Sequence, residues 1–208
     1  MKKFYTMVAQ QNIERSYYGD EQGKLYPKCQ KQVHMPLIVT LINEVKENEN
    51  FTVLAMDSFQ NPASQHNYEL LKEELEEHFP GRYTLEHINA PVEINMEGQI
   101  ALFKKLYRTF EADDEVYFDI TFGYKLIPMT ILVACNYAKK FVDGMRVRKL
   151  MYAVYDFTKK EDPTYVHRIL DVTSIFYLND FIDKLAQFDT QDPTVLIDQI
   201  FAIPDSEA

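Results

Sequence analysis

The sequence predicts an α/β protein: a Rossmann-like, doubly wound domain with a mostly parallel sheet of about six strands and helices on both faces. Strand-like and helix-like segments alternate along the chain, which implies right-handed βαβ units. With 46% hydrophobic and 13% aromatic residues, the 208-residue chain can also fill a packed core. No internal repeat or low-complexity tract argues for another architecture.

The strand candidates are short runs rich in β-branched and aromatic residues, several of them almost wholly apolar. We expect strands at 2–9, 51–57, 82–88, 115–121, 147–157 and 165–172. A long polar segment follows the first strand, and long loops inside compact domains are often functional.

The helix candidates repeat apolar residues every three or four positions. They cover 33–45, 62–79, 95–110, 124–142, 174–188 and a shorter stretch around 194–201. Pro36 is expected in a first turn, and Asn61 and Asn95 are expected N-caps. The segment 124–142 is apolar nearly all round, so we expect that helix to be buried on more than one side.

A change in composition near residues 188–194, "FDTQDPT", is the one candidate boundary. We expect a domain over residues 1–188. Residues 189–208 are then a C-terminal helix and tail, or a linker to an absent effector domain.

Charge and cysteine content exclude several classes. The net charge of −10 argues against non-specific binding of duplex DNA, because such binding needs an excess of Lys and Arg. The two cysteines form no CxxC pair, which favours the reducing cytoplasm. The most apolar segment has 13 residues, too few to cross a membrane. We expect no metal and no cofactor, because the five histidines are scattered and no metal-binding motif occurs.

The stretch "VYFDITFGYKLIPM", residues 116–129, places polar groups where a strand gives way to a helix. Ligands of open α/β sheets bind at such strand ends. Gly123 allows close approach to the backbone, the helix N-terminus attracts anions, and Lys125 and Thr121 add a cation and a hydroxyl. Asp119 is expected to hold the loop by accepting hydrogen bonds. A phosphate-type site and a simple turn both remain open, but the dinucleotide and P-loop fingerprints are absent.

This stretch resembles the signature of CRISPR-associated Rossmann-fold (CARF) domains, hydrophobic-Asp-hydrophobic-Thr-His-Gly-aromatic-Arg-x-x-Pro. The matching positions are Asp119, Thr121, Gly123, Tyr124 and Pro128. Phe122 stands where the family has His, and Lys125 stands where it has Arg. Lys125 keeps the positive charge of that Arg but lacks its planar guanidinium group, which can donate two parallel hydrogen bonds to a phosphate. The rest of the chain is compatible with the family over roughly 1–188.

The resemblance implies a homodimer that binds cyclic oligoadenylate across its two-fold axis, as a sensor in type III CRISPR defence that regulates a fused or partner effector. Four adenylates are preferred and six remain open. The signature residues that would line the site are Asp119, Thr121, Phe122, Gly123, Tyr124, Lys125 and Pro128. Further expected ligand-binding residues lie in the loops after the first two strands: Asn12, Arg15, Ser16, Ser58 and Phe59, with Tyr17 or Tyr18 stacking on a base.

Whether the chain is an enzyme stays open. The first alternative is a stand-alone ring nuclease that cleaves cyclic tetra-adenylate without a metal, using Lys125 and Thr121 as catalytic residues. The second is a dimeric α/β regulator with a mononucleotide pocket or none. The spacing of Arg82 and His87 fits a ribonuclease pattern, R-x4-6-H, but it falls inside an expected strand.

Overall fold

The computed structural model describes residues 1–57, 62–90, 95–159, 162–187, 195 and 197. The chain divides into two compact units, Met1–Thr173 and Ser174–Ala208. The predicted boundary between residues 188 and 189 lies outside the described residues and stays a prediction.

The first unit is built on a seven-stranded sheet with the order β2-β7-β6-β5-β1-β3-β4. The strands are β1 (Lys2–Met7), β2 (Tyr17–Gly19), β3 (Phe51–Asp57), β4 (Tyr83–Asn89), β5 (Glu115–Asp119), β6 (Arg146–Val154) and β7 (Val166–Asp171). Neighbours from β4 to β6 pair in parallel, whereas β7 runs antiparallel to β6. The doubly wound, mostly parallel α/β fold is therefore confirmed.

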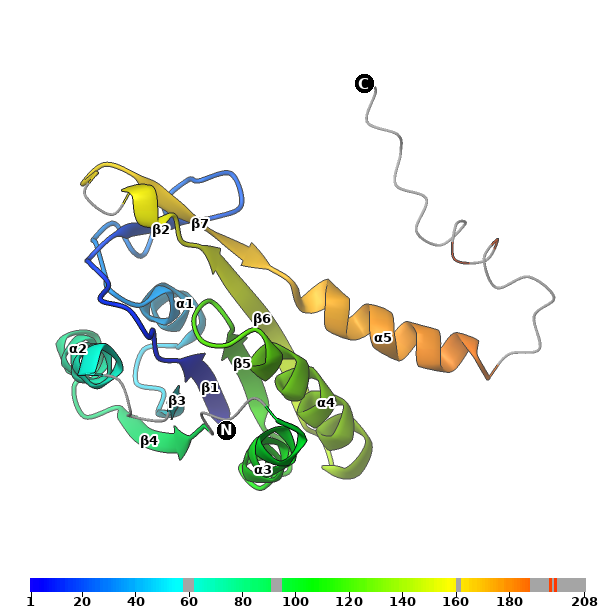
Figure 1. Cartoon of the computed structure of the whole chain (residues 1–208). Helices are drawn as coiled ribbons and strands as arrows, with labels where there is room; N and C mark the ends of the chain where they lie inside the picture. Colours follow the sequence, from blue (N-terminus) through cyan, green and yellow to red (C-terminus); the bar gives the residue numbers. More distant parts are fainter. Residues whose placement is uncertain (58–61, 91–94, 160–161, 188–194, 196, 198–208) are drawn as a thin grey trace. The chain divides into compact units, whose positions relative to one another are not determined.

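Helices cover both faces of this sheet. The first unit contains α1 (Pro36–Glu44), α2 (Pro62–His78), α3 (Met96–Tyr107), α4 (Leu126–Phe141) and the 3-10 turn η1 (Phe157–Lys159). Figure 1 shows α1 and α2 on one face and α3 and α4 on the other. The chain winds outward from β1 to β3 and β4, then returns to β5 and continues to β6. Winding thus reverses between β1 and β5.

The central strands carry the core because both of their faces are covered. Every residue of β3 is buried, as are all residues of β1 after Lys2. The ring of Phe4 stacks on Tyr117 at 4.5 Å between ring centroids, and Tyr5 stacks on Phe118 at the same separation. These pairs join β1 to β5 on both faces of the sheet, so the junction of the two strands is rigidly packed.

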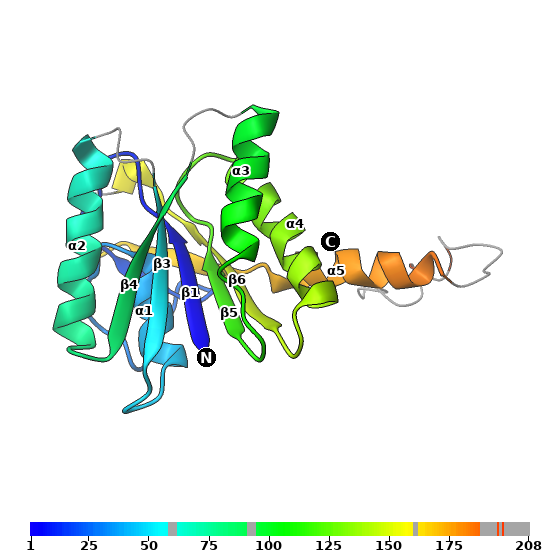
Figure 2. The same cartoon turned by 90° about the horizontal axis from the view of Figure 1, so that it is seen from below.

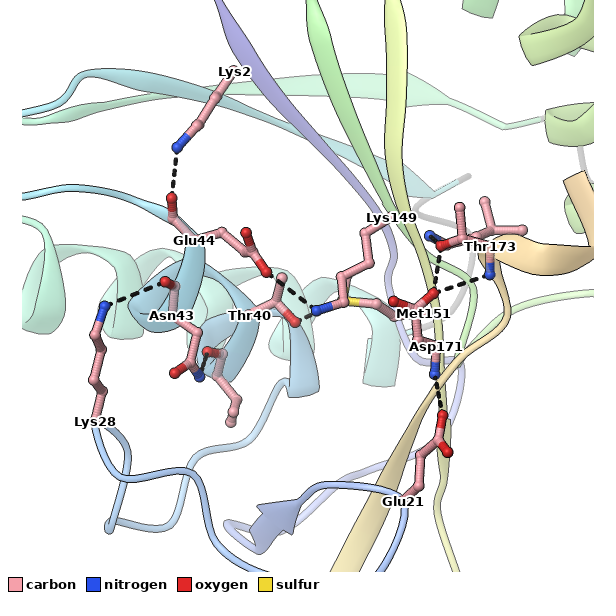
Figure 3. Close-up of polar contacts among 12 residues, drawn as sticks. Lys2, Glu21, Lys28, Thr40, Asn43, Glu44, Lys149, Met151, Asp171 and Thr173 are labelled. Carbon is pink, nitrogen blue, oxygen red and sulfur yellow. Dashed lines mark hydrogen bonds and ion pairs between the residues drawn. The ribbon is translucent and has the colours of Figure 1, made fainter. Parts of the chain in front are cut away.

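Polar side chains tie α1 to its neighbours (Figure 3). Lys149 of β6 contacts the Glu44 carboxylate at 3.1 Å, and Lys2 donates to the Glu44 carbonyl oxygen at 2.5 Å. Lys28 donates to the Asn43 carbonyl oxygen at 3.4 Å. Cations therefore satisfy the last carbonyl groups of α1, which have no partners within the helix.

Three expectations about the elements can be compared with the structure. The N-cap at Asn95 is confirmed, because its Oδ1 accepts from the Gly98 N–H at 2.8 Å. The strand β2 was missed, since Tyr17–Gly19 is too short to stand out within a polar loop. Asn61 lies outside the described residues.

The expectation that the helix over 124–142 is buried on more than one side is wrong for the single chain. One face of α4 is buried, whereas Met129 and Val133 are 61% and 57% exposed. Apolar residues around a helix indicate what surface it can bury, but the number of neighbouring elements decides what it does bury.

The last helix, α5 (Thr173–Leu185), is amphipathic and lies almost entirely in the second unit. Among the described residues, no helix combines the length and the apolar character needed to cross a bilayer.

Candidate functional site

The signature residues lie in and around the loop that connects β5 to α4, at the carboxyl edge of the sheet. β5 ends at Asp119 and α4 begins at Leu126. Because β5 pairs in parallel with β1, the loops after these two strands emerge at the same edge (Figure 2). This is also the point where the winding reverses, which is where open α/β sheets bind their ligands.

Asp119 anchors the loop from beneath. Its buried carboxylate accepts hydrogen bonds from the Thr121 N–H at 3.0 Å, the Thr121 hydroxyl at 2.5 Å and the Thr6 hydroxyl at 3.2 Å. The Leu37 N–H is a further donor. Burial nevertheless raises the pKa of Asp119 to about 6, because desolvation of the charge outweighs these bonds. The predicted role of Asp119 in holding the loop agrees with this geometry.

Thr121 uses its hydroxyl for structure. The hydroxyl donates to Asp119, and its oxygen accepts from the Ala153 N–H of β6 at 2.9 Å. The side chain therefore fastens the end of β5 to the neighbouring strand. Its proton is directed to Asp119 and is not available to a ligand.

The Asp-x-Thr turn recurs in this chain, so it is not in itself a mark of function. Thr158, Thr164 and Thr173 each donate their N–H and hydroxyl to the Asp two residues earlier. Thr173, drawn with Asp171 in Figure 3, also accepts from the Leu150 N–H of β6 at 2.8 Å. Thr121 accepts from the Ala153 N–H in the same way. What distinguishes the loop after β5 is the sequence that follows its turn.

Phe122 is turned inward. Its side chain is 8% exposed, and its ring lies 5.8 Å from that of Tyr155. Tyr155 in turn stacks on His167, whose pKa burial lowers. Although we expected Phe122 among the ligand-binding residues, it extends an aromatic cluster below the loop.

The next three residues face outward. Gly123 has a φ of +89°, and a Cβ at this position would lie 1.8 Å from Cε of Met7. Any other residue would therefore be strained in its backbone, and the end of the Met7 side chain would have to move. Tyr124 is 40% exposed, and Lys125 is the exposed N-cap residue of α4. Lys125 contacts no acidic side chain among the residues that the structure describes.

Pro128, the last signature residue, is half-buried in the first turn of α4. Proline fits there because N–H groups of a first turn have no partner within the helix. Of the N–H groups in this turn, that of Ile127 donates to the Tyr124 carbonyl oxygen at 2.9 Å and Pro128 has none, so the charge of this loop comes mainly from Lys125.

A small recess lies beside Gly123 and Tyr124. Its volume is about 10 Å³, room for a single water, and it is closed by Gln10 and Asp57. Gln10 Nε2 donates to the Asp57 carboxylate at 2.8 Å, which links the ends of β1 and β3. Neither residue was predicted, although the position of Asp57 at the end of an apolar strand was a usable signal.

The loop after β1 differs from expectation at several positions. Asn12 is exposed, but Ser16 is buried and its backbone pairs with that of Val33. Arg15 pairs with Glu77 of α2 at 3.2 Å. Tyr18 is 1% exposed, so it cannot stack on a base.

Asn67 of α2 holds this loop and was also missed. It is fully buried, and its Nδ2 donates to the carbonyl oxygens of Ala9 and Gln11 at 2.8 Å each. Tyr17 is half-buried in β2. Ser58 and Phe59 lie outside the described residues.

The N-terminus of α1, where dinucleotide-binding folds hold a pyrophosphate, is occupied by the protein's own carboxylates. Glu74 of α2 accepts from the N–H groups of His34 at 2.6 Å and Met35 at 3.2 Å. Asp119 accepts from the Leu37 N–H. The N-terminus of α1 is therefore not open to an anion, whereas that of α4 carries the exposed Lys125.

The described part of the chain contains no group of three or more His, Cys, Asp and Glu side chains placed to hold a metal ion. In comparisons with known proteins, the sequence matches no protein-family model and no curated protein.

Proposed function

We propose that this protein is a cytoplasmic cyclic oligoadenylate sensor of type III CRISPR defence, which binds the ring as a homodimer and regulates a fused or partner effector. The observation that carries the proposal is the junction of β5 and α4. Gly123 and Tyr124 are exposed there, and the exposed Lys125 lies at the N-terminus of α4. These groups together offer a local positive potential in a chain of net charge −10.

The size of the recess favours binding across two chains. Among the described residues this space is about 10 Å³ and cannot enclose an adenylate, so a ring would lie over the strand ends and need a second surface to cover it. A two-fold partner would supply that surface and a second Lys125. The exposed Met129 and Val133, on the helix that starts at this loop, offer apolar area for self-association.

Binding is favoured over cleavage. A ring nuclease would use Thr121 to position or activate the reacting groups, but the Thr121 hydroxyl is committed to Asp119 and Ala153. Lys125 remains as the one cation of the loop, and a single cation suits recognition of a phosphate better than the complete in-line reaction.

The test is a binding titration with cyclic tetra-adenylate and cyclic hexa-adenylate, with linear tetra-adenylate, ATP and NAD as comparisons. We expect tight binding of a ring and at least about a hundredfold weaker binding of the other compounds. Lys125→Glu should lower the affinity by at least about tenfold, because it replaces the attraction by repulsion. Analysis of the ring after incubation would reveal linear products if the protein cleaves it.

The matched control is Lys72→Glu, which makes the same charge change at an exposed position of α2. It should leave the affinity unchanged. Equal affinities of the wild type and the Lys125→Glu variant would contradict the proposal. A mononucleotide that binds as tightly as the ring would support the regulator alternative instead.

A further inference from the structure

A second cavity lies at the opposite end of the sheet, beneath the start of β3. Its volume is about 770 Å³, within the range of roughly 300–1,000 Å³ that small-molecule sites occupy. Its walls come from three places: the loop 28–31, the end of α1 with the turn 45–48, and the end of α2 with the turn to Arg82. In Figure 2 the connection between α1 and β3 emerges at the same end as the N-terminus.

Basic side chains dominate the charged groups of this cavity. Lys28, Lys31 and Arg82 line it together with a single acidic residue, Glu47. Such an excess stands out because the whole chain has 32 acidic residues against 22 Lys and Arg. The cavity is therefore a local positive site on an acidic protein.

The C-terminal ends of α1 and α2 both line this cavity, and each carries partial negative charge on its last carbonyl groups. Basic side chains donate to two carbonyl oxygens at and just after the end of α1. Lys28 donates to the Asn43 carbonyl oxygen at 3.4 Å (Figure 3), and Arg82 donates to that of Lys46 at 3.3 Å. Lys31 makes no side-chain polar contact within the described residues, so its ammonium is available to a ligand.

The remaining walls are apolar. Ile42, Val45, Phe79 and Pro80 line the cavity, and the Arg82 guanidinium lies 5.2 Å from the centre of the Phe79 ring. Cys29 adds a neutral surface, because burial raises the pKa of its thiol. A ligand that fits both kinds of wall has an anionic group and an apolar body.

We propose that this cavity binds an amphipathic anion, in which one phosphate or carboxylate group is joined to an apolar or aromatic body. The anionic group lies between Lys31 and Arg82, where the planar guanidinium can donate two parallel hydrogen bonds. The apolar body rests on Ile42, Val45 and Phe79. The site is separate from the loop at Lys125, at the other end of the strands.

The probes are 1-naphthyl phosphate and 1-naphthoate. The controls are 1-naphthol, which has the aromatic body without the anionic group, and inorganic phosphate, which has the anionic group without the body. Binding to the full chain is followed by changes in backbone amide NMR signals. We expect at least one of the two amphipathic anions to bind at least about tenfold more tightly than naphthol and phosphate. The shifted signals should belong to residues 28–31, 42–48 and 78–82. The tighter of the two anions identifies the class as phosphate ester or carboxylate.

The variant Arg82→Met keeps an apolar stem against Phe79 but removes the charge, and Lys31→Met changes a side chain without polar contacts in the described structure. Each variant should lower the affinity for the amphipathic anion by at least about fivefold, while the affinity for cyclic tetra-adenylate stays unchanged. Lys72→Met, outside the cavity, is the matched control. The inference is overturned if neither anion binds at about 1 mM, if the shifts map elsewhere, or if neither cavity variant changes the affinity.

Discussion

At the scale of single residues, burial sets the pKa of the Asp in the repeated Asp-x-Thr turn. Asp156 and Asp162 are exposed, and the hydrogen bonds from Thr158 and Thr164 lower their pKa values. Asp119 accepts the same kind of bonds in a buried site, and desolvation raises its pKa to about 6. The same local sequence thus titrates in opposite directions because its surroundings differ.

This shift predicts a pH dependence of stability. The pKa of Asp119 is raised from 3.8 to about 6 on folding, so between these values the folded protein holds a proton that the unfolded chain has released. Its contribution to the free energy of unfolding is therefore largest below about pH 4 and is lost as the pH rises to 6. Between pH 4 and pH 6, we expect the free energy of unfolding of the wild type to fall by about 3 kcal/mol relative to that of Asp119→Asn.

Urea unfolding of both proteins between pH 4 and 7 measures this difference. Other titrating groups are present in both chains, so their contributions cancel. A difference that does not change with pH would show that Asp119 titrates at its ordinary value.

At the scale of elements, α1 begins without a cap of its own. Its N-cap residue is Met35, which has no side-chain acceptor, and Pro36 follows. Glu74 and Asp119 supply the missing acceptors from α2 and β5. The helix is therefore fixed by its neighbours, and its N-terminus cannot also receive a phosphate.

The substitution Glu74→Gln tests whether the Glu74 carboxylate caps the N-terminus of α1. The Gln side chain keeps one oxygen but turns its NH₂ group toward a backbone N–H, so one charge-assisted bond is lost and two donors face each other. We expect the free energy of unfolding to fall by about 2–3 kcal/mol in urea denaturation. The neighbouring Glu73 is exposed, and Glu73→Gln should change stability by less than about 0.5 kcal/mol. Similar losses in the two variants would show that Glu74 does not cap α1.

At the scale of the whole molecule, two basic regions lie at opposite edges of the sheet. The carboxyl edge carries Lys125 beside the exposed side of α4, whereas the opposite edge carries the basic cavity. A sheet that is covered on both faces leaves its two ends for ligands. The two anion sites that we propose thus lie at opposite ends of the sheet in a chain of net negative charge.

Self-association is the prediction at this scale. We expect a mass twice the 24.5 kDa of the chain in sedimentation experiments and one cyclic tetra-adenylate per two chains. Val133→Asp places a charge on the exposed side of α4 and should give monomers that bind the ring at least about tenfold more weakly.

Gln65→Asp is the matched control, since it adds the same charge at an exposed position of α2 on the other face of the sheet. It should leave the dimer and the binding intact. One ring bound per monomer would rule out a site shared between two chains.

The sequence by itself determined the fold class, the order of the main elements and the position of the loop after β5. Apolar periodicity, the Asn95 cap and the glycine at 123 are local signals, because each acts through the backbone within a few residues. The role of Asp119 in holding the loop could be predicted in part, because its bonds to Thr121 are local.

Only the tertiary structure decided which side chains of the loops after β1 and β5 are free. Thr121 is bound to β6, Phe122 is buried against Tyr155, and Arg15 is paired with Glu77. Gln10, Asp57 and Asn67 escaped prediction because their partners lie about 50 residues or more away in sequence. Such contacts depend on which strands and helices become neighbours, and a single sequence encodes that arrangement only through the packing of the whole core.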